Sequence, residues 1–476
     1  MPDQNLQLSS EMTGQAVAAI FARQRKRALV LRSSTSGERI AALRRLEAGI
    51  LRRRSALYAA LAADLHKPEA EVDLSELMPV LAELRHACRQ IPAWMSPRRV
   101  RPTMAMFGTT AQVRPEPRGV SLIISPWNYP FNLTLGPLVS AIAAGCTAII
   151  KPSELTPFTS AVIAEIIADS FVPDDVALFQ GDADVAQSLL ALPFDHIFFT
   201  GSPAVGKIVM AAAARHLTSV TLELGGKSPV IVDETADLNR AARNIVWGKF
   251  SNNGQTCIAP DYAYVHQSRL PAFIEAARAQ ITTFYGDAAR SPAYGRIVNS
   301  HHWARVTRLI EDARAGGATI HTGGKGDAAN LFISPTLMTG MRPDAQIMQE
   351  EIFGPVLPIL PYTEIAAPIE TINASAKPLA LYVFSKDPKR VQRIIGETSS
   401  GGACVNTVMA QYLHQNLPFG GVNNSGLGSA HGLYGFRAFS HERAVLTEKY
   451  SATALLFPPY TPQVRRMIKM TVRFLT

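Results

Sequence analysis

The first part of the chain carries apolar residues at helical spacing. In RIAALRRLEAGILRRRSALYAALAADL (39–65), Ala, Leu and Ile recur every three or four positions with charged residues between them. This pattern predicts helices that bury one face, and it extends over residues 15–95. It ends at MSPRRVRPTMAMFG (95–108), where two prolines and a basic cluster predict a linker or an arm.

From about residue 118 the pattern changes to short apolar runs that alternate with helical stretches. GVSLIIS (119–125) and CTAIIK (146–151) are almost continuously apolar, as strands buried on both faces are. Helical spacing follows each of them, in LTLGPLVSAIAAG (133–145) and PFTSAVIAEIIADSF (157–171). The alternation continues to about residue 217 and predicts a parallel sheet with helices on both faces.

A second series begins at PVIV (229–232). Its predicted helices cover 237–250 and 270–285, and its later predicted strands cover 262–267, 355–362 and 379–385. The sequence therefore predicts an α/β fold with two doubly wound parallel-sheet lobes.

Composition supports a large folded protein without metal or disulfide staples. The chain has 476 residues, which is more than one hydrophobic core needs, and 47% of them are hydrophobic. The four cysteines are widely spaced with no CxxC pair, which argues against a disulfide framework or a zinc site. The N-terminus lacks a signal-peptide pattern and no run of about 18 uncharged apolar residues occurs, so we expect a cytoplasmic protein.

The formal net charge is +9, and much of the excess lies in short basic clusters. Solvated helix faces explain such clusters best, and no basic motif with interleaved aromatic residues predicts nucleic-acid binding. The tail QVRRMIKMTVRFL (463–475) places Val464, Ile468 and Leu475 on one helical face, with Arg and Lys on another. We expect it to dock on its own protein or to be disordered, with contact to an anionic membrane surface as the less favoured alternative.

The stretch NNGQTCIAP (252–260) contains the main chemical candidate, Cys257. A lone cysteine is usually an inert core thiol, but this one follows Gly and Gln in a predicted loop. Asn128, in ISPWNYP, is either a turn residue or a donor to an oxyanion. Glu223 ends an apolar strand, where a carboxylate is either ion-paired or a base with a raised pKa. Together the three supply a nucleophile, an oxyanion donor and a base.

Two further stretches suggest a dinucleotide site. GSPAVGKI (201–208) is not a phosphate loop, because Ile208 replaces the hydroxyl that would bind magnesium. Gly201 and Gly206 nevertheless bring backbone N–H groups and a helix N-terminus toward an anion. In KPSE, Lys151 and Glu154 follow a strand, where they either contact a ribose or form a solvated turn.

These motifs together resemble the aldehyde dehydrogenase family from about residue 15 to 450. The family's order is kept in PWNYP, KPSE, FTGSPAVG, LELGGKSP, GQTCIAP, EEIFGP and PFGGVNNSGLG. TCIAPDY, PLALYVFS and HGLYGFRAFSH are similar to the class 3 branch. Within that branch, residues 86–101, 181–206 and 455–460 are most similar to bacterial coniferyl aldehyde dehydrogenases.

The resemblance implies a division of the chain into four parts and a homodimer joined by a β arm. The implied parts are a dinucleotide-binding domain (1–98 and 117–222), a catalytic domain (223–408), a bridging and oligomerisation arm (99–116 and 436–450), and a basic C-terminal tail (451–476).

The resemblance also implies NAD(P)-dependent oxidation of an aldehyde to the acid through a thiohemiacetal and a thioester, without a metal. An aromatic aldehyde such as coniferyl aldehyde is the expected substrate. Medium- or long-chain aldehydes are the alternative, and a catalytically silent scaffold is a weaker one. NAD is the expected acceptor, with NADP as a second.

The resemblance also implies a role for each candidate residue. Cys257 is the nucleophile, Asn128 with the Cys257 N–H is the oxyanion donor, and Glu223 is the base. The implied cofactor contacts are the adenosine ribose for Lys151 and Glu154, the dinucleotide for Gly201, Ser202 and Gly206, the nicotinamide ribose for Glu351, and packing beside it for Phe353.

Overall fold

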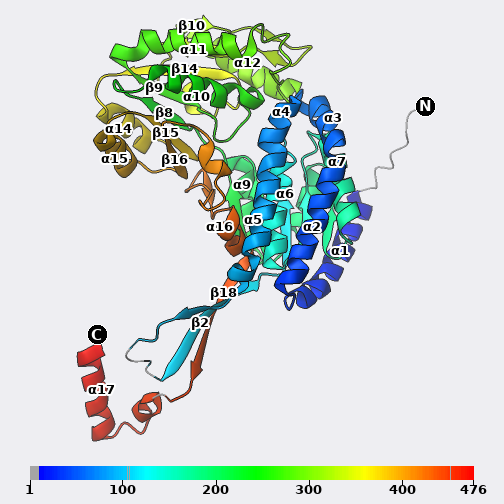
Figure 1. The fold of residues 1–476 in the computed structure, drawn as a ribbon, viewed down its shortest axis with the longest axis vertical. Helices are drawn as coiled ribbons and strands as arrows, with labels where there is room; N and C mark the ends of the chain where they lie inside the picture. The colour runs from blue at the N-terminus through cyan, green and yellow to red at the C-terminus, as the bar shows by residue number, and fades with distance from the viewer. Residues whose placement is uncertain (1–9, 104–105, 107, 451, 476) are drawn as a thin grey trace.

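The fold consists of two α/β lobes and a narrow arm that projects from the first lobe (Figure 1). The structure, a computed structural model, describes residues 10–103, 106, 108–450 and 452–475. Residue Leu475 belongs to the last helix, but its side chain lies outside what the structure describes.

Helices form almost all of residues 10–95, as the apolar spacing predicts. The second helix begins with a capping box, in which the Thr35 side chain accepts from the Glu38 N–H and the Glu38 carboxylate accepts from the Thr35 N–H. The helices are α1 (Ser10–Leu31), α2 (Ser36–Arg52), α3 (Arg54–Leu65), α4 (Glu69–Val72), the π-helical turn η1 (Asp73–Leu77) and α5 (Met78–Met95).

The first lobe is built on a six-stranded sheet that is parallel except at one edge. Ile123 of the strand β3 packs with α2, α5, α6 and α7, whereas Leu122 and Ile124 pack with α1, α8 and α9 on the other face. Both faces are therefore covered, which explains the continuous apolar run. The strand order is β17 (Gly426–Leu427), β7 (Ser219–Glu223), β6 (His196–Thr200), β3 (Val120–Ile124), β4 (Thr147–Lys151), β5 (Val176–Leu178), with β17 antiparallel to β7; the helices are α6 (Asn132–Ala144), α7 (Pro157–Ser170), α8 (Ala183–Leu190) and α9 (Pro203–Ala214).

The second lobe contains a seven-stranded sheet, parallel except for the edge strand β10. Its predicted strands and helices are present, whereas the strands β10, β13 and β16 and the helices α12 to α15 were not predicted. The order is β10 (Thr319–Thr322), β13 (Thr336–Thr339), β14 (Val356–Tyr362), β9 (Tyr262–His266), β8 (Pro229–Val232), β15 (Ala380–Phe384), β16 (Gly402–Val405); the helices are α10 (Leu238–Phe250), α11 (Leu270–Tyr285), α12 (Ser300–Ala315), α13 (Gln346–Gln349), α14 (Ala366–Ala374) and α15 (Pro388–Glu397), and β11 (Gly326–Asp327) pairs with β12 (Phe332–Ile333).

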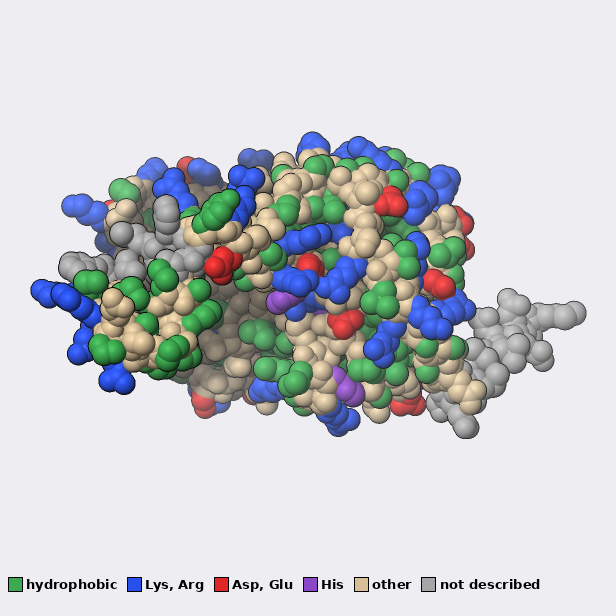
Figure 2. All heavy atoms as spheres, turned by 90° about the horizontal axis from the view of Figure 1, so that it is seen from below, with side chains coloured by type: hydrophobic (Ala, Val, Ile, Leu, Met, Phe, Trp, Pro, Cys, Tyr) green, Lys and Arg blue, Asp and Glu red, His purple; other side chains and the backbone are tan. Residues whose placement is uncertain are grey.

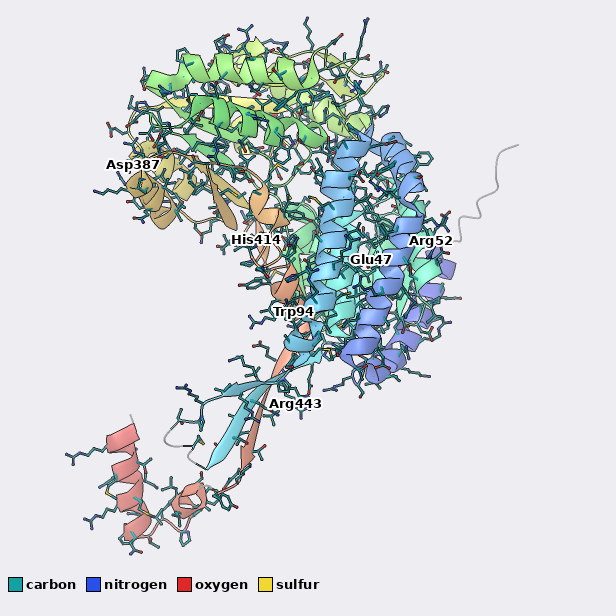
Figure 3. All side chains as sticks on the ribbon, in the orientation of Figure 1. Glu47, Arg52, Trp94, Asp387, His414 and Arg443 are labelled. Atoms are coloured by element: carbon teal, nitrogen blue, oxygen red, sulfur yellow. The ribbon has the colours of Figure 1, made fainter. Side chains whose placement is uncertain are left out.

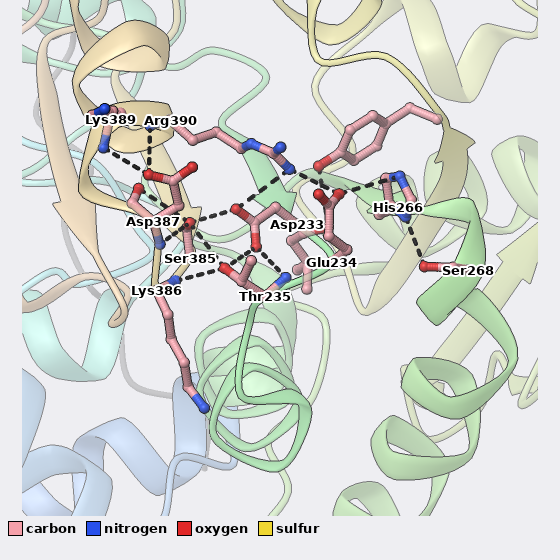
Figure 4. A network of polar contacts seen from close by, with 12 residues as sticks. Asp233, Glu234, Thr235, His266, Ser268, Ser385, Lys386, Asp387, Lys389 and Arg390 are labelled. Atoms are coloured by element: carbon pink, nitrogen blue, oxygen red, sulfur yellow. Dashed lines mark hydrogen bonds and ion pairs between the residues drawn. The ribbon is translucent and has the colours of Figure 1, made fainter.

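A polar cluster closes the carboxyl ends of β8 and β15, at one end of the second sheet (Figure 4). The buried Asp233 carboxylate accepts hydrogen bonds from Ser385 Oγ and from the backbone and hydroxyl of Thr235. Arg390 pairs with Glu234 at 2.8 Å, and Glu234 also contacts His266. These groups partner one another, so the cluster holds strand ends together.

The arm is an antiparallel three-stranded sheet of β1 (Arg98–Val100), β2 (Thr109–Pro117) and β18 (Ser440–Glu448). β18 pairs with β2 along its whole length, and Arg443 adds an ion pair to Glu116 at 3.1 Å. At the root of the arm, Trp94 packs on Phe436 of α16 (Gly432–Ala438), with ring centroids 5.6 Å apart (Figure 3). The segment from β17 to α16 thus returns to the first lobe, although the ranges expected for that lobe end at residue 222.

The tail continues from the arm as the short helix η6 (Ala452–Leu456) and α17 (Pro462–Leu475). Val464 and Ile468 of α17 are half-buried, while Arg465 and Lys469 are exposed. Seen from below, apolar side chains gather on the side of the arm and tail with Lys and Arg around them (Figure 2). Docking of this surface on the protein itself, and the less favoured contact with an anionic membrane, both stay predictions. Among the described helices, none is long and apolar enough to cross a membrane.

A buried carboxyl group joins α5 to the start of α16. Glu83 Oε1 accepts the Gly432 N–H at 2.7 Å, and the Glu83 residue is 7% exposed. Burial raises the pKa of Glu83 from 4.5 to about 7, against the opposing effect of the Gly432 N–H.

We predict that Glu83 makes the protein less stable as the pH rises. Because its pKa in the folded state exceeds that in the unfolded state, its contribution is complete below pH 4.5 and is lost as the pH passes about 7. The difference corresponds to about 3 kcal/mol. Thermal unfolding of wild type and Glu83→Gln at several pH values checks this, with the exposed Glu275→Gln as control. Equal pH dependence in wild type and Glu83→Gln would contradict it.

Candidate active site

Cys257 lies on a loop whose backbone is forced into an unusual shape. After α10, Asn252, Asn253 and Gly254 all have left-handed backbones, with φ of 49°, 57° and 73°. Gln255 then locks the loop from the inside: its side-chain amide donates to the carbonyls of Asn252 and Arg296, each at 3.0 Å. The thiol is therefore presented from a rigid turn, which a catalytic nucleophile requires.

Asn128 reaches this loop from the first lobe. Its Nδ2 donates to the Gln255 carbonyl at 2.9 Å, and its own carbonyl accepts from Asn252 Nδ2 at 2.8 Å. The next residue, Tyr129, bonds to the Thr256 hydroxyl at 2.7 Å. The structure thus brings Asn128 and the Cys257 loop together, and one amide hydrogen of Asn128 is left for a ligand.

Glu223 is a buried carboxyl group with no hydrogen-bond partner on either oxygen among the described residues. It ends β7 and lines the same cavity as Cys257. Burial raises the pKa of Glu223 well above its ordinary value. The ion-paired alternative is therefore wrong, and the unpartnered group suits a general base.

Burial also raises the pKa of the Cys257 thiol, and the nearby carboxylates of Glu351 and Glu223 raise it further. Backbone N–H groups of Cys257 and Ile258 oppose the shift. The thiol is therefore neutral at rest and needs a base when it attacks. The four cysteines are all free thiols, so the disulfide alternative for Cys257 fails. In the described part of the chain, no cluster of His, Cys, Asp or Glu could hold a metal ion.

Cys257 and Glu223 line a cavity of about 440 Å³ between the two lobes. Most of the wall is apolar, and Leu74 and Met78 on the wall are also exposed to solvent. Aromatic side chains form part of the wall; they include Tyr129, Trp247, Phe284, Tyr412 and Phe419. The cavity suits a bulky apolar molecule.

The residues predicted for the dinucleotide lie at the ends of β4 and β6. Lys151 is buried, and its Nζ donates to Glu154 Oε2 at 2.6 Å, while the Glu154 side chain is 46% exposed. Ser202 caps α9 by accepting the Val205 N–H. A Cβ at Gly206 would lie 2.7 Å from the Leu224 side chain, so a larger residue there would require Leu224 to shift.

Glu351 and Phe353 lie on the loop before β14. Glu351 Oε1 is buried and has no hydrogen-bond partner among the described residues. Burial raises the pKa of Glu351 to about 8, with a smaller contribution from the nearby Asp261 carboxylate. A Cβ at Gly225 would collide with the Glu351 carboxyl group. Phe353 has a left-handed backbone and packs its ring edge-on against Trp127, with centroids 5.3 Å apart.

These features fit NAD(P). A charged pair at a strand end, the capped N-terminus of α9 and the unpartnered Glu351 oxygen are what ribose hydroxyls and an anionic pyrophosphate need.

Several residues that hold this site escaped the sequence analysis. Arg305 donates to the carbonyls of Glu351 and Ile352, and Asp261 accepts the Ile352 N–H at 3.0 Å. Lys227 pairs with Asp261 at 2.5 Å and donates to the Glu350 carbonyl. The position of Lys227 in LELGGKSP was a signal, whereas Arg305 lies in an ordinary amphipathic helix.

Comparison with known proteins agrees with this geometry. Residues 3–445 match the sequence profile of the aldehyde dehydrogenase family. The chain belongs to this family. Aldehyde dehydrogenases oxidise aldehydes with NAD(P) as the acceptor, and the relatives below include family 3 members.

The chain is 44% identical over 426 residues to aldehyde dehydrogenase family 3 member A2 of Rattus norvegicus, covering 89% of this chain and 86% of the relative. It is 43% identical to the dimeric NADP-preferring aldehyde dehydrogenase of Canis lupus familiaris, covering 91% and 94%. Among solved structures, the substrate-bound state of Staphylococcus aureus AldH superimposes with a TM-score of 0.91 at 40% identity, covering 95% and 99%. The coniferyl branch is not among these relatives.

We predict that Gly254→Ala displaces Cys257. A Cβ there would overlap the Gly354 carbonyl in addition to straining the left-handed backbone. Gly286→Ala is the control, because Gly286 also has a positive φ, 53°, but has open space around it. The control should lose about 1–2 kcal/mol of stability and keep its Cys257 alkylation rate. Gly254→Ala should lose more stability, and its rate of Cys257 alkylation should differ from wild type by at least about tenfold. Identical behaviour of the two variants would refute the prediction.

Proposed function

We propose that this aldehyde dehydrogenase oxidises bulky apolar aldehydes through a covalent intermediate on Cys257. The observation that carries the proposal is the shared cavity: a half-buried thiol and an unpartnered carboxyl group line one apolar space of about 440 Å³. The same observation argues against the silent scaffold, because a buried carboxyl group without a partner costs stability and persists where it has a use.

The mechanism follows from the positions of three side chains. Cys257 Sγ gives up its proton to solvent water and attacks the aldehyde carbon. The free amide hydrogen of Asn128 and the Cys257 N–H donate to the oxyanion of the thiohemiacetal. Bound NAD(P) supplies the hydride acceptor that allows the thiohemiacetal carbon to become a thioester. Glu223 then takes a proton from water, the water oxygen attacks the thioester, and the acid and the free thiol result.

For the acceptor we propose NAD, with NADP as a second. Lys151 and Glu154 would hold the adenosine ribose, and the Glu154 carboxylate would repel a 2′-phosphate. Because the Glu154 side chain is 46% exposed, it has room to turn away. The canine relative, whose name states NADP preference, shows that such use occurs in similar chains.

For the substrate we propose an aromatic aldehyde of the coniferyl type, on the strength of the three similar segments named above and the aromatic cavity wall. Long apolar aldehydes are the second candidate. They are favoured by the mostly apolar wall of the cavity and by a Staphylococcus aureus relative, 43% identical, that is named 4,4'-diaponeurosporen-aldehyde dehydrogenase.

We also propose a homodimer joined by the arm. Among the described residues, nothing pairs with the outer edges of β18 and β1 in the projecting three-stranded sheet, and such edges favour pairing with another chain. The canine relative is named as dimeric.

Turnover of purified protein tests the proposed function, with coniferyl aldehyde, benzaldehyde and a medium-chain alkanal, each with NAD and NADP. We predict the highest kcat/KM with coniferyl aldehyde and NAD. Cys257→Ala should lose at least about 1000-fold in kcat and still bind NAD. Cys88→Ala, a buried thiol outside the cavity, is the matched control and should stay active. An alkanal preference would support the second candidate, and wild-type turnover by Cys257→Ala would refute the mechanism.

A further inference from the structure

A fully buried ion pair lies behind the oxyanion donor. Lys67 Nζ and Glu76 Oε1 are 2.6 Å apart, and both side chains are 0% exposed. Lys67 follows the end of α3, and Glu76 lies in the π-helical turn η1. Neither residue lies on a surface, so solvated charge does not explain them.

The Lys67 ammonium is bonded to the backbone of the active site. Its Nζ donates to the Asn128 carbonyl at 3.1 Å and stands 4.2 Å from the centroid of the Tyr129 ring. The same carbonyl accepts from Asn252 Nδ2. One oxygen atom therefore joins Lys67 to the loop that carries Cys257.

Glu76 fixes the other side of the same segment. Its second oxygen, Oε2, accepts the Asn132 N–H at 2.9 Å, and Asn132 Nδ2 donates to the Ser75 carbonyl at 3.0 Å. The two side chains thus bond to the backbone on both sides of Tyr129, at the Asn128 carbonyl and the Asn132 N–H. π-Helical turns of this kind occur often at functional sites.

Stability alone does not account for this pair. Taking two charges out of water costs several kcal/mol per ion, and well-packed neutral side chains of similar size are often equally stable or better. Apolar replacements, however, would lose the hydrogen bonds that fix Asn128 and its neighbours.

We propose that Lys67 and Glu76 are positioning residues, which hold Asn128 and, through its carbonyl, the Asn252–Cys257 loop in the geometry for attack. The inference rests on the proposed roles of Cys257 and Asn128. A misplacement of about 1 Å at a reacting centre costs about 100-fold in rate, so removal of this hold should appear in kcat.

The test is the double variant Lys67→Met/Glu76→Gln, which removes both charges together and keeps similar volumes. The exposed pair Arg393–Glu397, changed to Arg393→Met/Glu397→Gln, is the matched control. The expected result is a folded, NAD-binding double variant with kcat lowered by about 10- to 100-fold, and a control within twofold of wild type.

A structural role is separated by repeating the change in an Asn128→Ala background. If the pair acts by placing the Asn128 amide, its removal there should cost less in kcat than in wild type, because the amide that it places is already absent. Full additivity would overturn the inference, as would a folded double variant with wild-type kcat. Glu76→Gln alone keeps an acceptor for the Asn132 N–H and is the second variant if the double one fails to fold. Its kcat should fall measurably but by less than tenfold. A wild-type kcat would count against the positioning role of the pair.

The two proposals fail in different ways. Wild-type protein that turns over no aldehyde would remove the proposed function itself. An active wild type with an unaffected double variant would remove only the role of Lys67 and Glu76.

Discussion

The hydrogen bond from Asn128 Nδ2 to the Gln255 carbonyl joins the two lobes where the reaction is expected. Asn128 follows β3, at the centre of the first sheet, and Gln255 precedes the nucleophile of the second lobe. Both partners are buried, so losing one would leave the other unsatisfied at a cost of about 1–3 kcal/mol. Together with the Asn252–Asn128 and Tyr129–Thr256 hydrogen bonds, this contact fixes the oxyanion donor relative to the loop that carries Cys257.

Around this contact the protein keeps carboxyl groups that its own structure does not satisfy. Among the described residues, Glu223 has no partner on either oxygen, and Glu351 and Glu71 each have one oxygen without a partner. Asp233 and Asp261, by contrast, are paired. The contrast between satisfied and unsatisfied acids separates groups that hold the fold from groups that wait for water or a ribose.

Much of this could be predicted from the sequence. The apolar run around Ile123 is continuous because both faces of its strand are covered, and that pattern is visible in one dimension. Cys257, Asn128 and Glu223 could be proposed from the sequence because each stands in a recognisable motif of the family. Lys67 and Glu76 were not, since charges in an amphipathic helical stretch look like a solvated face until the fold brings Asn128, 61 residues away, against them. Likewise the polar edge strand β10 has no apolar run to reveal it.

Trapping the intermediate tests the central claim most directly. In Glu223→Gln the thiol and the oxyanion donor remain, but the base for the hydrolytic water is lost. Mixed with NAD and an aldehyde substrate, this variant should hold one acyl group per chain, located on the Cys257 peptide by mass spectrometry, and should release acid far more slowly than wild type. An unmodified Cys257 peptide together with undiminished acid release would contradict the account.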